Sequence, residues 1–86
     1  MKNKLYYRKR LDKIDKRIAL DVARKIDVVL EFWKWKKENK IKLIDKKREK
    51  DIIKRNAKMA GLKEEFIQGI YEDIRNEIKK EWKKQF

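Results

Sequence analysis

The sequence from Leu5 to Lys40 decides the fold: LYYRKRLDKIDKRIALDVARKIDVVLEFWKWKKENK. Apolar side chains recur in it at steps of three or four residues, and they form the stripe Leu11, Ile14, Ile18, Val22, Val29 and Phe32. Lys25 and Lys36 fall on the same stripe. Because no Gly or Pro interrupts the pattern, we expect one continuous helix of roughly 35 residues, about 50 Å long.

This helix is too long for the rest of the chain to cover. The 86 residues allow one domain, which we assign to residues 1–86. The uncovered part of the stripe then needs a second chain. We therefore expect an intertwined homodimeric helical bundle, in which Trp33 helps to bury the seam between the chains and Trp35 is half exposed.

Two further helices are expected after the first. Asp45 is a plausible N-cap for a second helix that runs to about Ala60, and Gly61 suits the residue that ends it. Its inner face is expected to carry Arg48, Glu49, Ile52, Ile53, Asn56, Met59 and Ala60. A third helix extends from about Lys63 to the C-terminus. With no Pro and only two Gly, the sequence predicts an all-α fold of three helices per chain.

The composition excludes several kinds of chemistry. The chain lacks His, Cys, Ser and Thr, which removes hydroxyl and thiol nucleophiles, histidine acid–base catalysis and the usual ligands of transition metals. We therefore expect no metal and no cofactor. No apolar run is long enough to span a bilayer, and the first five residues do not resemble a signal peptide, so we expect a cytoplasmic protein without a membrane partner.

The net charge of +13 indicates an anionic partner. Nucleic acid is one candidate and a small polyanionic substrate is another. Charged residues on apolar stripes help to separate them: Lys25 and Lys36 on the first helix, and Asp45 and Glu49 one turn apart on the second. Since an isolated buried charge is costly, these residues either pair with each other, as Lys36 with Glu49, or serve a ligand. Periodicity leaves both readings open.

The order of these features resembles a known family. Arg8 followed by Leu11–Ile18 (LDKIDKRI), then Lys36–Asn39 (KKEN) and Asp45–Glu49 (DKKRE), is similar to the all-helical chorismate mutases. Related isochorismate-pyruvate lyases share much of this pattern. The resemblance implies a homodimer with active sites shared between its chains. It also implies the pericyclic rearrangement of chorismate to prephenate in aromatic amino acid biosynthesis, a reaction that needs no cofactor.

The resemblance also implies a role for each matching residue. Arg8 would reach across the dimer to one substrate carboxylate, which its planar fork can bind bidentately. Lys36 would donate to the breaking ether oxygen and to a carboxylate. Asp45 and Glu49 would receive the ring hydroxyl, and Arg48 would support the carboxylates.

Two positions depart from the family pattern. Lys25 stands where the family usually has a second arginine, and it keeps the charge without the bidentate fork. Trp82 stands where the family has Gln or Glu near the ether oxygen, and a shift of one residue would place Glu81 there instead. Lys25, Glu81 and Trp82 are therefore expected substrate-binding residues.

Two alternatives to a mutase remain open on the sequence. An isochorismate-pyruvate lyase would use the same cationic pocket. A basic helical protein that binds nucleic acid would explain the net charge, but the 15 acidic residues are interspersed with the basic ones, and Asp45 and Glu49 would repel phosphate. We therefore expect a small dianionic substrate rather than nucleic acid.

Overall fold

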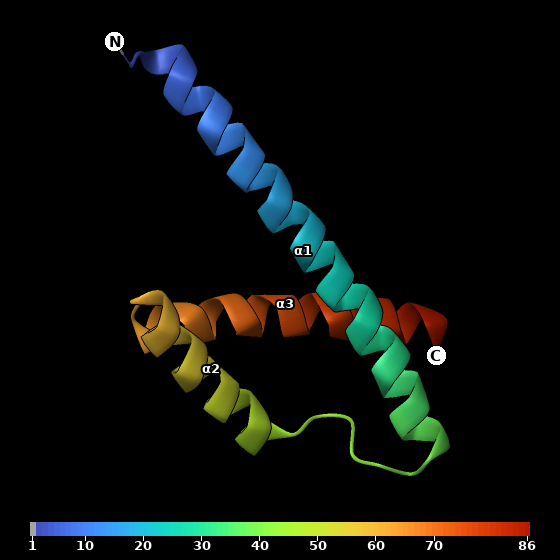
Figure 1. Cartoon of the computed structure of the whole chain (residues 1–86). Helices are drawn as coiled ribbons and strands as arrows, with labels where there is room; N and C mark the ends of the chain where they lie inside the picture. The colour runs from blue at the N-terminus through green and yellow to red at the C-terminus, as the bar shows by residue number, and fades with distance from the viewer. Residues whose placement is uncertain (1) are drawn as a thin grey trace.

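The computed structural model describes residues 2–86 and contains three α-helices, with no strand in that range (Figure 1). They are α1 (Lys4–Glu38), α2 (Lys46–Ala60) and α3 (Glu64–Gln85). The described chain measures 59 × 28 × 16 Å, and α1 gives it its length. The expectation of an all-α chain with a very long first helix is confirmed.

Side-chain caps set the limits of α1. The Asn3 side chain accepts a hydrogen bond from the Tyr6 amide at 3.1 Å and caps the N-terminus. At the other end, the backbone N–H and the side-chain amide of Asn39 both donate to the Trp35 carbonyl, at 3.0 and 2.8 Å. Lys40 then adopts a left-handed φ of 57°, which turns the chain out of the helix. The helix therefore ends at Glu38, slightly earlier than expected.

The limits of α2 follow the expected local signals. Asp45 Oδ1 accepts a hydrogen bond from the Arg48 amide at 3.0 Å, so Asp45 is the N-cap. Gly61 ends the helix in the left-handed conformation with φ 69°, where a residue without Cβ is favoured. The Leu62 amide donates to the Ala57 carbonyl at 3.0 Å and completes this C-terminal turn.

The core is small and lies where α3 meets the other two helices. Its buried side chains are Trp33, Ile53, Ala57 and Ile78. Trp33 is only 6% exposed, and its ring centre lies 5.8 Å from that of Trp82 in an edge-to-face arrangement. The expectation that Trp33 lies in a seam between chains is therefore wrong, because α3 of the same chain buries it. Trp35 is half exposed, as expected.

Two residues expected on the inner face of α2 lie on its exposed side. Met59 is 78% exposed and Ala60 is also exposed, and Ala57 is buried instead. Ala57 follows Ile53 by four residues and so lies on the same helical face, whereas Met59 is turned about 200° from Ala57. The inner face of α2 is thus narrower than its apolar composition indicates.

The helices are arranged around α3. Within residues 2–86, α3 has close backbone contacts with α1 and with α2, but α1 and α2 have none with each other. The first half of α1 extends beyond the other helices (Figure 1). Its apolar residues Leu11, Ile14 and Ile18 are 55%, 51% and 56% exposed. Among the described helices, none is long and apolar enough to cross a membrane.

Candidate active site

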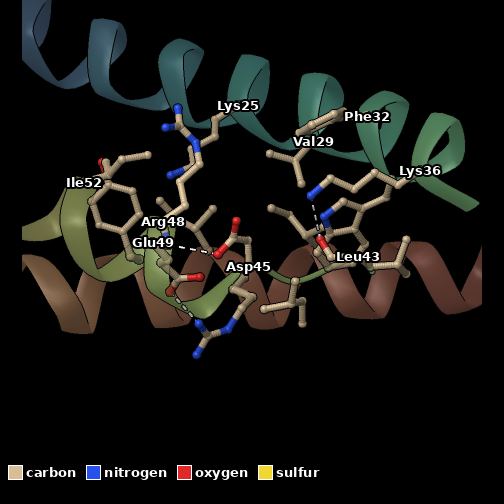
Figure 2. Close-up of a pocket in the computed structure, with 15 residues that line it drawn as sticks. Lys25, Val29, Phe32, Lys36, Leu43, Asp45, Arg48, Glu49 and Ile52 are labelled. Carbon is tan, nitrogen blue, oxygen red and sulfur yellow. Dashed lines mark hydrogen bonds and ion pairs between the residues drawn. The ribbon is translucent and has the colours of Figure 1, made fainter. Parts of the chain in front are cut away.

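A cavity of about 290 Å³ lies between α1 and α2, with α3 as its floor (Figure 2). Its size is near the lower end of small-molecule sites. Apolar side chains form most of its wall, and charged side chains from all three helices point into it. The lining residues are Lys25, Val29, Phe32, Trp33, Lys36, Leu43, Ile44, Asp45, Arg48, Glu49, Ile52, Tyr71, Ile74, Arg75 and Ile78.

Five of the eight residues predicted from the sequence line this one cavity. Figure 2 shows Lys25 and Lys36 pointing into it from α1. Asp45, Arg48 and Glu49 line it from the first turn of α2 and its cap. The charged positions on the apolar stripes therefore converge in space, although α1 and α2 are joined only through α3 and a connecting loop.

Lys36 is held by the loop between α1 and α2. Its ammonium donates a hydrogen bond to the Leu43 carbonyl at 3.1 Å and lies 4.4 Å from the centre of the Phe32 ring. A lysine ammonium has three N–H donors, so this contact leaves two for a ligand. In the described chain Lys36 has no ion-pair partner, and Glu49 pairs with Arg75 instead. The alternative of a structural Lys36–Glu49 ion pair is therefore wrong.

Lys25 lies at the other end of the cavity, over an aromatic ring of α3. Its ammonium is 3.7 Å from the centre of the Tyr71 ring, a cation–π contact. The Tyr71 hydroxyl accepts a hydrogen bond from the Asn56 side chain at 3.0 Å, which fixes the ring against α2. Burial lowers the pKa of Lys25, and the nearby Glu49 carboxylate partly opposes this effect.

Asp45 has two roles in this geometry. Its carboxylate caps α2 through the Arg48 amide and also lines the cavity. The free amides at the N-terminus of α2 favour a negative charge at this position. One carboxylate oxygen is used by the cap, and the other remains available to a ligand hydroxyl.

Two polar cavity residues on α3 were not predicted as site residues from the sequence. Tyr71 contacts Lys25, and Arg75 forms an ion pair and a hydrogen bond with Glu49. A signal for Arg75 was present: it lies four residues after Tyr71 and one after Ile74, so it is a charge on the apolar stripe of the third helix. The criterion that identified Lys25 and Lys36 identifies Arg75 when it is applied to α3.

Three predicted residues lie outside the cavity. Arg8 precedes Lys25 by 17 residues on α1, which places it about 25 Å away along the helix. Glu81 accepts a hydrogen bond from Lys84 at 3.1 Å. Trp82 packs on Trp33 and lies 4.2 Å from Phe86 between ring centres. A role of Glu81 or Trp82 in substrate binding stays a prediction.

Comparison with known proteins gives the family. The model of the family described as chorismate mutase type II matches residues 7–82. No curated protein and no solved structure matches the chain. The matched range includes the cavity residues of all three helices as well as Arg8. On this match, which covers most of its length, the chain belongs to the chorismate mutase type II family.

Proposed function

We propose that the protein is a chorismate mutase, an isomerase that converts chorismate to prephenate by a pericyclic rearrangement. The observation that carries the proposal is the convergence of Lys25, Lys36, Asp45, Arg48 and Glu49 on one cavity. The family match supports the same activity. The rearrangement needs neither nucleophile nor metal, which suits a chain without His, Cys, Ser and Thr.

The charges of the cavity complement this substrate. Four cationic side chains (Lys25, Lys36, Arg48 and Arg75) and two carboxylates (Asp45 and Glu49) line it. Their formal charges sum to +2, which is opposite in sign to the charge of the two carboxylates of chorismate. The apolar remainder of the wall lowers the local dielectric constant, which strengthens each of these electrostatic contacts. A polyanion such as nucleic acid would instead meet Asp45 and Glu49 at the cavity.

Catalysis is proposed to consist of positioning and electrostatic stabilisation. Lys25, Lys36 and Arg48 hold the two carboxylates so that the substrate is kept in its compact reactive conformer. Lys36 donates to the ether oxygen, on which negative charge develops as the bond breaks. Asp45 and Glu49 accept from the ring hydroxyl. No proton needs to leave the substrate, and no covalent intermediate forms.

The proposal includes a homodimer, because Arg8 cannot reach the cavity of its own chain. A separation of about 25 Å along α1 is several times the length of an arginine side chain. The exposed apolar residues Leu11, Ile14 and Ile18 provide the surface for a second chain. Packed there, each chain would offer its Arg8 to the cavity of the other. We take residues 1–86 as a single domain of this dimer and expect it in the cytoplasm.

A chorismate assay run beside size-exclusion chromatography tests this function. We expect loss of chorismate with formation of prephenate, from a species of twice the chain mass. The control is Lys34→Ala, which replaces an exposed lysine of α1 outside the cavity and is expected to retain full activity. A folded protein with no rate above the uncatalysed reaction contradicts the proposal. Pyruvate release from isochorismate without prephenate formation would show a lyase instead.

A further inference from the structure

The Glu49 carboxylate is held by a single side chain. Arg75 Nη1 donates to Glu49 Oε1, and within residues 2–86 no other side chain donates a hydrogen bond to this carboxylate. The two side chains are 24% and 28% exposed, so the pair is partly shielded from water. It joins α2 to α3 across 26 residues of sequence.

The pair also separates two cavities. Glu49 and Arg75 both line the 290 Å³ cavity, and both line a second cavity of about 350 Å³ on its other side. The second cavity contains Lys46, Lys50, Glu64 and Glu72 near the surface. Glu49 could therefore turn toward those lysines if Arg75 did not hold it. Arg75 fixes which of the two cavities the Glu49 carboxylate faces.

Arg75 has a second effect on the charges of the first cavity. A partly buried carboxylate without a partner is costly, so it would take the nearest available cation. The candidates in the cavity are Lys25, which already lies near enough to Glu49 for their charges to interact, and Lys36. Pairing with Glu49 would take one of these ammonium groups from the substrate carboxylates. Because Arg75 is paired with Glu49, the ammonium groups of both lysines stay free for an anionic ligand.

We propose that Arg75 is a positioning residue for the rearrangement: it orients Glu49 toward the substrate and keeps Lys25 and Lys36 from pairing with Glu49. This inference rests on the proposed function and adds to it a residue of α3. A guanidinium suits the task because its planar fork fixes a carboxylate in direction, whereas an ammonium is a point charge.

A double-mutant cycle on kcat/KM tests the inference. Arg75→Gln is expected to lower kcat/KM by about 10- to 100-fold, the cost of a catalytic group misplaced by about 1 Å. Arg75→Lys should recover part of this loss, since it restores the charge without the fork. In a Glu49→Gln background, Arg75→Gln should change kcat/KM by less than about twofold, because the group on which it acts is already absent.

The control is an ion pair on the same helix that is remote from the cavity. Lys80→Gln breaks the exposed Lys80–Glu77 pair (3.9 Å) and should leave kcat/KM at the wild-type value. Circular dichroism and thermal unfolding establish that each variant is folded at the assay temperature. The Glu49→Gln/Arg75→Gln double variant carries no unpaired charge at this position, so it provides a folded comparison even if Arg75→Gln alone unfolds.

The outcomes separate this inference from the proposed function. An active wild type with an equally active Arg75→Gln variant overturns the role of Arg75 and leaves the mutase activity standing. An equal loss in both backgrounds also overturns it, because Arg75 would then act on the substrate directly. A wild type that neither turns over chorismate nor binds prephenate in calorimetry overturns the function and this inference together.

Discussion

The ammonium of Lys25 lies 3.7 Å from the centre of the Tyr71 ring, and this contact places a partly buried cation at one end of the cavity. Tyr71 is itself held by the Asn56 side chain. The cavity thus keeps a positive charge in place before any anion binds. Such preorganisation favours binding at some expense to the stability of the empty protein, since burial disfavours the charged form of Lys25.

The cost of burying the Lys25 charge predicts a pH-dependent difference in the free energy of unfolding between wild type and Lys25→Met. Burial lowers the pKa of Lys25 below the ordinary lysine value of 10.5 in the folded state, so the unfolded chain binds this proton more tightly. The cost is fully present below the folded pKa and disappears as the pH rises through that pKa toward 10.5. We expect Lys25→Met to be the more stable protein at neutral pH, with an advantage that shrinks as the pH rises.

Urea unfolding at neutral pH and at pH 10.5 measures this difference. Lys34→Met is the control for the loss of one lysine, since Lys34 is exposed on the same helix. An advantage of Lys25→Met that stays constant or grows with pH would contradict the prediction. The same variant should lose chorismate mutase activity, because a cation of the cavity is gone.

Lys36 is expected to contribute most to the chemical step. Lys36→Ala removes the donor to the ether oxygen, and kcat should fall by about 100- to 1,000-fold, as for other donors to a developing oxyanion. The Leu43 carbonyl also loses its hydrogen bond, so stability should fall slightly. Steady-state kinetics on folded protein measures the effect. A kcat within a few-fold of wild type would mean that another group stabilises the ether oxygen.

Mixed dimers test the contribution of Arg8 across chains. Arg8→Ala and Lys36→Ala should each be nearly inactive alone. If the two proteins are unfolded together and refolded, half of randomly assorted dimers are mixed, and each mixed dimer has one intact site, so about a quarter of wild-type activity should return. Mixing the two variant proteins without unfolding them is the control, because it shows whether dimers exchange chains spontaneously. No recovery after verified mixing would show that Arg8 does not act from the second chain.

Trp82→Ala distinguishes a core residue from a substrate-binding one. Trp82 packs on Trp33 and Phe86, so its removal should cost about 3 kcal/mol of the free energy of unfolding. Since Trp82 does not line the cavity of its own chain, KM and kcat of the folded variant should stay within a few-fold of wild type. A large rise in KM with little loss of stability would establish the binding role that the sequence predicts.

The features that could be predicted from the sequence are those with local causes. Asp45 and Gly61 set the ends of α2 through contacts within one turn, and Lys25 and Lys36 stand out against the apolar period of α1. Trp33 was assigned to the wrong surface because its partner, Trp82, lies on α3, and periodicity does not say which helix covers a stripe. Arg75 has the same local signal as Lys25 and Lys36, a charge on an apolar stripe, but its partner Glu49 lies 26 residues away and could not be named from the period.

Because the first half of α1 is exposed and is proposed to pack against a second chain, association is part of how the protein reaches its native state. Each helix forms through contacts a few residues apart, and the chain has no proline whose isomerisation could delay it. Folding of the single chain should therefore be complete within milliseconds. For the proposed dimer, the slow event is then the encounter of two chains. Its half-time should shorten in proportion to the concentration of protein, so the cell's rate of synthesis would set how soon the proposed dimer forms.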